Sequence, residues 1–221
     1  MLVKELFEEF KTVTSGKTFD ALLPPLVFLV INSFFGLNPA VILSLGLAAL
    51  LGSIRLLRNQ TWYYALGGLL AVAAASGLAI LTRSAAGYFI PSLISSTFLL
   101  LLAVSSLLAG KPLAAWASHL TRGWPVEWFW RQDIKPAYRE VTIVWSVFFA
   151  LRLIIQIILF RAGDAARLGW TSTLLGWPVT VVVLVFSYIY GIWRLRSLGG
   201  PGVQEFQAGK EPPWEGQKRG F

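Results

Sequence analysis

The stretch VTIVWSVFFALRLIIQIILF, residues 141–160, consists almost entirely of hydrocarbon side chains. An α-helix needs about twenty apolar residues to cross the roughly 30 Å of hydrocarbon in a bilayer. This stretch therefore predicts a membrane-spanning helix. It also holds Arg152 and Gln156, and an arginine near the centre of a bilayer is costly unless it faces protein or water.

The composition extends this prediction to the whole chain. Of its 221 residues, 56% are hydrophobic and 14% are charged, whereas soluble domains carry about 25% charged residues. Five more segments are apolar enough to span, namely residues 21–36, 39–57, 61–81, 88–109 and 168–193. We therefore expect an all-α, polytopic membrane protein with a bundle of about six transmembrane helices within residues 20–196. The short GLNP sequence between the first two predicts a tight turn and a helical hairpin.

The Lys and Arg residues predict which ends of the spans face the cytoplasm. With the N-terminus inside, fifteen of the nineteen basic residues fall in inward-facing segments, and the outward loops hold only Arg83, Arg161 and Arg167. Cytoplasmic loops carry such an excess. Both termini are therefore expected in the cytoplasm. The basic residues that give the net charge of +8 lie between the apolar spans and near the chain ends, where they act as topology signals. We therefore expect no nucleic-acid partner.

Two segments outside the spans are expected to contact the membrane surface. Leu2, Leu6 and Phe10 recur every four residues among charged side chains, which predicts an amphipathic helix within residues 1–19. This helix lies on the membrane or packs on the ends of the spans. Residues 110–139 are rich in aromatic side chains that favour the interface, so we expect an interfacial cytoplasmic loop with one or two half-buried helices; they include Trp116, Trp124, Trp128, Trp130 and Tyr138.

The last segment, residues 197–221, is rich in Gly, Pro and charge, which predicts a disordered cytoplasmic tail. The sixth predicted span contains a proline, and the third is rich in small residues. Pro178 lacks an N–H and is expected to free the carbonyl of Leu174. Small residues in the third span suit close helix packing, within the chain or in a homo-oligomer; they are Gly67, Gly68, Ala71, Ala75 and Ala79.

Polar residues at similar depth form a candidate site. Gln156 follows Arg152 by one helical turn, and Trp145 shares their stripe. The matching depth of other spans holds Asn32, Ser95 and Ser96. No Asp or Glu lies within a predicted span, so these neutral groups are the candidate partners of Arg152. Two hypotheses stay open: a dry network that bridges helices, or a hydrated cavity that binds a lipid phosphate, a small anion or an organic acid.

The sequence offers little for catalysis. It has no cysteine and one histidine, His119, and it lacks HExxH, GxSxG and phosphate-loop motifs. We therefore expect no enzyme, no catalytic residue, no metal and no cofactor.

Several stretches together resemble a known family. They are LLPPLVFLVINSFFG, RLLRNQ, GYFIPSLISSTF, GKPL, WRQDIKPAYREVTIVWSVFFALRLIIQIILF and LGWP, which spread over about residues 20–180. In these the chain resembles an uncharacterised, largely actinobacterial family of polytopic membrane proteins that is distantly similar to the intracellular septation protein A family. The resemblance implies a multi-pass protein of the bacterial plasma membrane, linked to envelope maintenance and division, with no established activity. It also implies an Asn near Ser95 and Ser96, where this chain has only hydroxyls.

These observations favour one function and leave an alternative. The first is a non-enzymatic integral inner-membrane protein of the cell envelope, related to septation or envelope maintenance, that acts through membrane lipids, a membrane-protein partner or a second copy of itself. The alternative is a small channel or transporter for an anionic or polar solute, with its site around Arg152. An accessory subunit of a larger membrane complex is a third hypothesis.

Overall fold

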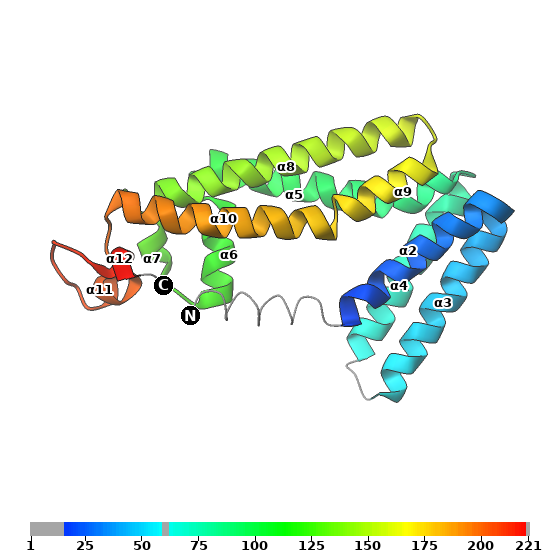
Figure 1. Ribbon diagram of the computed structural model, residues 1–221, viewed down its shortest axis with the longest axis horizontal. Coiled ribbons are helices and arrows are strands. Elements are labelled where there is room, and N and C mark those ends of the chain that lie inside the picture. The colour runs from blue at the N-terminus through cyan, green and yellow to red at the C-terminus, as the bar shows by residue number, and fades with distance from the viewer. Residues whose placement is uncertain (1–15, 59–61, 220–221) are drawn as a thin grey trace. The chain divides into compact units, whose positions relative to one another are not determined.

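The computed structural model describes residues 16–58 and 62–219 (Figure 1). Over these residues the chain forms helices and turns, with no strand. They divide into two compact units: unit 1 comprises residues 16–93 and 156–174, and unit 2 comprises residues 94–155 and 175–219. Leu2, Leu6 and Phe10 of the predicted amphipathic helix lie outside the described residues.

Four helical stretches in the described part are long and apolar enough to cross a membrane: Leu37–Leu57, Ala85–Leu108, Lys135–Arg161 and Ala165–Leu198. The prediction of an all-helical chain with membrane-crossing helices is confirmed at this level. The first and third predicted spans correspond to α2 (Gly16–Phe35) and α4 (Trp62–Leu81). Their described apolar parts, Leu23–Phe35 and Leu66–Leu81, are shorter than a bilayer requires.

Unit 1 begins with three consecutive helices, α2, α3 (Leu37–Leu57) and α4, which lie side by side in Figure 1. Only Gly36 separates α2 from α3, so the chain reverses direction within one residue. Gly36 has φ of 81°, in the left-handed region that glycine adopts without steric cost. The GLNP sequence therefore forms the tight turn that it predicts.

The core of unit 1 is aromatic. Phe28 of α2 stacks on Tyr88 at a centroid distance of 3.9 Å, and Phe89 meets Phe28 edge to face. Tyr88 and Phe89 belong to the short 3₁₀ helix η1 (Ala85–Phe89) that leads into α5 (Ile90–Leu108). Ala75 and Ala79 of α4 are buried in this core, so part of the predicted small-residue stripe packs within the chain.

Unit 2 contains most of the second half of the chain. It takes residues from 94 onward of α5 and residues up to 155 of α8 (Lys135–Arg161). The remaining helices of unit 2 are α6 (Leu113–Arg122), α7 (Val126–Phe129), α10 (Trp177–Leu198), α11 (Val203–Gln207) and α12 (Gly216–Arg219).

The predicted span at residues 168–193 is not one continuous helix. Helix α9 (Ala165–Leu174) ends three residues before α10 begins at Trp177. Pro178 has no N–H to donate to the Leu174 carbonyl, and Gly176 has φ of −69° and ψ of −98°, outside the helical region. Pro178 instead occupies the first turn of α10, where no N–H is needed.

Two aromatic side chains of the predicted interfacial loop lie in a protein core. Trp128 and Phe129 are almost fully buried, and they pack with Ile134 and Leu195 in a protein core. The Trp128 indole N–H donates to the Pro201 carbonyl at 3.0 Å. An aromatic ring with a polar edge needs apolar surroundings and a hydrogen-bond acceptor, which a membrane interface or a protein core can supply. For Trp128 the protein core supplies both.

The segment after Leu198, for which the sequence predicts disorder, contains two short helices in the structure. Its helices α11 and α12 are joined through one carboxylate, because Glu205 accepts hydrogen bonds from the backbone N–H groups of Gly202, Glu215 and Gly216 at 2.9, 3.0 and 2.9 Å. Gln217 donates to the same Pro201 carbonyl as Trp128, at 3.0 Å. A charged acceptor and a shared carbonyl thus order a sequence that has few apolar residues.

Gly87 of η1 tests the packing of unit 1. A Cβ at this position would lie 2.8 Å from the Leu78 carbonyl oxygen and would overlap the Thr82 hydroxyl. We expect Gly87→Ala to destabilise the protein by about 1–3 kcal/mol, because the backbone must shift. Thermal unfolding of the purified protein in detergent measures the change. Gly77→Ala is the matched control, since its Cβ meets nothing within 4 Å and alanine favours the helix; equal losses in both variants would contradict this packing.

Glu205 predicts a pH dependence of the C-terminal segment. Backbone N–H donors, chiefly that of Gly202, hold the pKa of this carboxyl below its usual range. Because the folded pKa is depressed, the stabilisation is complete above the ordinary value and is lost as the pH falls through the folded pKa. Hydrogen exchange of residues 199–217 should therefore accelerate in acid beyond its intrinsic pH dependence. At neutral pH Glu205→Gln should produce the same loosening, whereas Glu211→Gln should not.

Candidate functional site

Three helices of unit 2 line a partly open cavity of about 360 Å³. Its walls are single faces of α6, α8 and α10, since the lining positions on each helix recur three and four residues apart. On α10, for example, these positions include Leu184, Ser187, Tyr188, Gly191 and Leu195. The volume falls in the range of about 300–1,000 Å³ that is typical of small-molecule sites.

The cavity exists because the facing side chains are short. Helix α6 presents Ala114, Ala117 and Ser118 to it, and α10 presents Gly191. A Cβ at Gly191 would meet no atom within 4 Å. Larger rings on α8, those of Trp145 and Phe149, form part of the wall and lie 5.5 Å apart between centroids.

Hydroxyl groups hold the start of α6 in place. The first N–H groups of a helix have no partner within the helix. Here the Leu113 N–H donates to Ser106 Oγ of α5 at 3.0 Å, and the Ala114 N–H donates to Thr142 Oγ1 of α8 at 3.1 Å. Thr142 in turn donates to the Tyr138 carbonyl at 2.8 Å. Side chains of two neighbouring helices therefore cap α6 and position the cavity wall.

An ion pair joins the other two walls. Arg194 of α10 donates to both carboxylate oxygens of Glu140 on α8, at 2.8 and 3.0 Å, and the Tyr190 hydroxyl donates to Glu140 at 2.7 Å. Glu140 thereby accepts three hydrogen bonds. This bidentate arrangement is geometrically specific and sets the register of α8 against α10.

The charged group of the cavity is Arg122, in the last turn of α6. Its guanidinium lies 4.7 Å from the Trp124 ring centroid and 5.7 Å from that of Tyr188, within cation–π range. The turn that places Trp124 there passes through Gly123, which has φ of 67°. It is held by a 2.6 Å contact between a His119 ring nitrogen and the Trp124 carbonyl.

Trp145 is the one predicted site residue that lines this cavity. Arg152 lies two turns further along α8; its side chain is partly buried and is not part of the lining. On α5, Ser96 is buried and Ser95 is exposed. The residues of the predicted layer that belong to unit 2 thus occupy different surroundings.

Asn32 and Gln156 belong to unit 1, where Gln156 forms a buried polar contact. Its side-chain amide donates to Ser92 Oγ of α5 at 2.9 Å and to Ser172 Oγ of α9 at 3.1 Å. Asn32 lies near the end of α2, and its backbone carbonyl accepts from the Gly36 N–H at 3.2 Å. Gln156 therefore joins three helices through two serines that the sequence did not single out, and the dry network around Arg152 stays a prediction.

The sequence reasoning also missed the cavity residues Arg122, Ser187, Tyr188 and Gly191. Arg122 counted only as a topology signal. The spacing of Ser187 and Gly191, four residues apart in an apolar helix, was an available signal, because small residues so placed leave room for a neighbour.

The fold and the cavity define a class: over the residues that the structure describes, an all-helical protein with helices suited to crossing a membrane and with a partly open cavity between three helices. The chain belongs to the family DUF3159, described as a protein of unknown function, whose model matches residues 16–194. Comparison with curated proteins and with solved structures finds no match. Membership of a family without known function is thereby confirmed, and similarity to the intracellular septation protein A family stays a prediction.

Gln156 tests the polar contact of unit 1. Gln156→Leu removes the donor from both serine hydroxyls, and interhelical hydrogen bonds in membrane proteins contribute about 0.6 kcal/mol on average and up to about 1.7. We expect a loss of about 1–2 kcal/mol in unfolding stability in detergent or lipid. Ser92→Ala should cost less and should be non-additive with Gln156→Leu, since both remove the same bond. Ser95→Ala, on the exposed face of α5, should have no effect.

Proposed function

We propose that this chain is a non-enzymatic integral inner-membrane protein of the cell envelope that acts by holding a membrane lipid in the cavity of unit 2. The observation that supports this most is the cavity itself, about 360 Å³ between apolar helices suited to a membrane. At about 30 Å³ for each group of water size, it has room for about a dozen such groups, comparable to part of one acyl chain.

The character of the walls supports a lipid over a polar solute. Leu113, Val141 and Leu184 line the cavity beside Trp145 and Phe149. An apolar wall favours the burial of hydrocarbon, by about 25 cal/mol for each Å² removed from water. The transport hypothesis placed its site at Arg152, which does not line this cavity.

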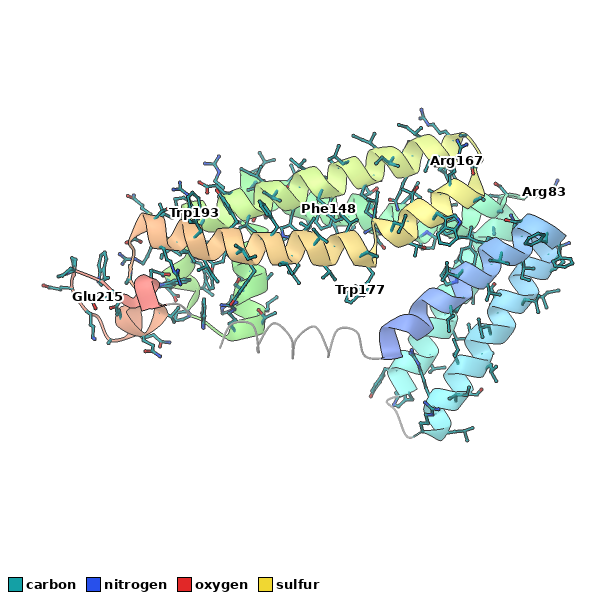
Figure 2. All side chains as sticks on the ribbon, in the orientation of Figure 1. Arg83, Phe148, Arg167, Trp177, Trp193 and Glu215 are labelled. Carbon is teal, nitrogen blue, oxygen red and sulfur yellow. The ribbon has the colours of Figure 1, made fainter. Side chains whose placement is uncertain are left out.

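The proposal includes a topology of six spans with both termini in the cytoplasm. Its support is the pair of apolar helices α2 and α4, which add to the four long stretches, and the placement of the basic residues. In this arrangement the large hydrophobic side chains that the structure leaves exposed and that do not line the cavity face lipid; examples are Leu101, Ile158, Val182 and Trp193, the last labelled near the end of α10 in Figure 2.

Filling the cavity tests this function. At Gly191, which lines the cavity, an added Cβ meets no atom within 4 Å, so Gly191→Leu should place its side chain in the cavity and strongly reduce lipid occupancy. The probe is a phosphatidylcholine with a photoreactive diazirine on one acyl chain, incorporated into vesicles with the purified protein. After illumination, mass spectrometry should find adducts on cavity-lining residues of α6, α8 and α10 in the unmodified protein, reduced at least fivefold in Gly191→Leu.

The matched control is Gly46→Leu on α3, where an added Cβ also meets nothing within 4 Å and which does not belong to the lining of this cavity. It should label as the unmodified protein does. Labelling of the lining that is the same in both leucine variants would contradict the proposal.

A further inference from the structure

The polar groups of the cavity gather around Arg122. The side chains of Ser118 on α6 and Tyr138 on α8 line the cavity together with Arg122. Tyr188, on α10, lies under the guanidinium. One turn of α6 separates Ser118 from Arg122, so residues of all three walls bring polar atoms to the same part of the lining.

Arg122 is also held in orientation. The rings of Trp124 and Tyr188 both lie within 6 Å of the guanidinium carbon, which restricts where the group can turn. An arginine that is already oriented loses less side-chain entropy when it binds, and its planar N–H donors match the geometry of phosphate oxygens. The cavity thus combines an apolar wall with a positive group suited to an anion.

A second observation points to a polar atom in the ligand. Ser187 lines the cavity and is 8% exposed, and its hydroxyl has no hydrogen-bond partner among the described residues. Buried hydroxyl groups nearly always have a partner. Ser187 and Tyr188 both line the cavity, so a ligand inside it can reach the Ser187 hydroxyl.

We propose that the occupant of the cavity is an anionic phospholipid of the surrounding membrane, with one acyl chain between α6, α8 and α10 and its phosphate at Arg122. This inference rests on the proposed function and narrows it. A net-anionic head is favoured over a zwitterionic one, because in the latter a choline cation offsets the phosphate charge that Arg122 attracts. A basic residue near an anionic lipid typically contributes a preference of about fivefold.

The experiment compares two photoreactive lipids with the same diazirine-bearing acyl chain, phosphatidylglycerol and phosphatidylcholine, in otherwise identical vesicles. In the unmodified protein, adducts on the cavity lining should form about fivefold more with phosphatidylglycerol. Arg122→Gln should reduce this ratio to about one. Arg196→Gln, which removes an exposed arginine of α10 outside the lining, should leave the ratio unchanged.

The phosphatidylcholine arm separates the two proposals. Equal labelling of the lining by both lipids in the unmodified protein would overturn the preference for an anionic phospholipid. A fivefold ratio that persists in Arg122→Gln would overturn the role of Arg122. In both cases the proposal that the cavity binds lipid still stands. If neither lipid gives adducts that Gly191→Leu removes, the proposed function itself fails. Competition by unlabelled phosphatidylglycerol against phosphatidylcholine in the unmodified protein gives the same test without a variant at Arg122, and equal competition overturns the inference.

Discussion

The hydrogen bond between the Ala114 N–H and Thr142 Oγ1 is the contact on which the site of unit 2 depends. A backbone N–H at a helix start has no partner within its own helix and needs an acceptor elsewhere. Thr142 accepts this bond and donates its own proton to the Tyr138 carbonyl, so the hydroxyl is satisfied on both sides. With Ser106 as the second acceptor, α6 is attached to α5 and α8, and its short side chains leave a cavity against α10.

The same rule accounts for the polar residues elsewhere in the chain. Gln156 is fully buried in unit 1, and its amide donates to hydroxyls of two other helices. Glu140 accepts hydrogen bonds from the hydroxyl of Tyr190 and from Nε and Nη2 of Arg194. Polar side chains in this protein therefore join helices, and the positions of these contacts decide which faces meet.

The C-terminal segment shows how packing overrides composition. Residues after Leu198 have the Gly, Pro and charge content of a disordered tail. In the structure Pro201 accepts from the buried Trp128 indole, and Val203 and Phe206 pack on the cluster that contains Leu195. Because Leu195 and Tyr138 belong to that packing and also line the cavity, the folded tail supports the wall of the proposed lipid site.

The sequence by itself determined that the chain is helical, where the long apolar stretches lie, and that a glycine turn joins α2 to α3. These properties depend on neighbours within about one or two turns, so periodicity and composition record them. It also marked Gln156 as a buried contact and Trp145 as part of an inward face. Only the tertiary structure decided that Ser92 and Ser172 are the partners of Gln156, that Pro178 divides the last apolar stretch into two helices, and that Arg122 reaches a cavity.

Depth along a helix can be counted from sequence, but which faces meet depends on packing between segments far apart in the chain. The empty space of a cavity depends on all of its walls at once.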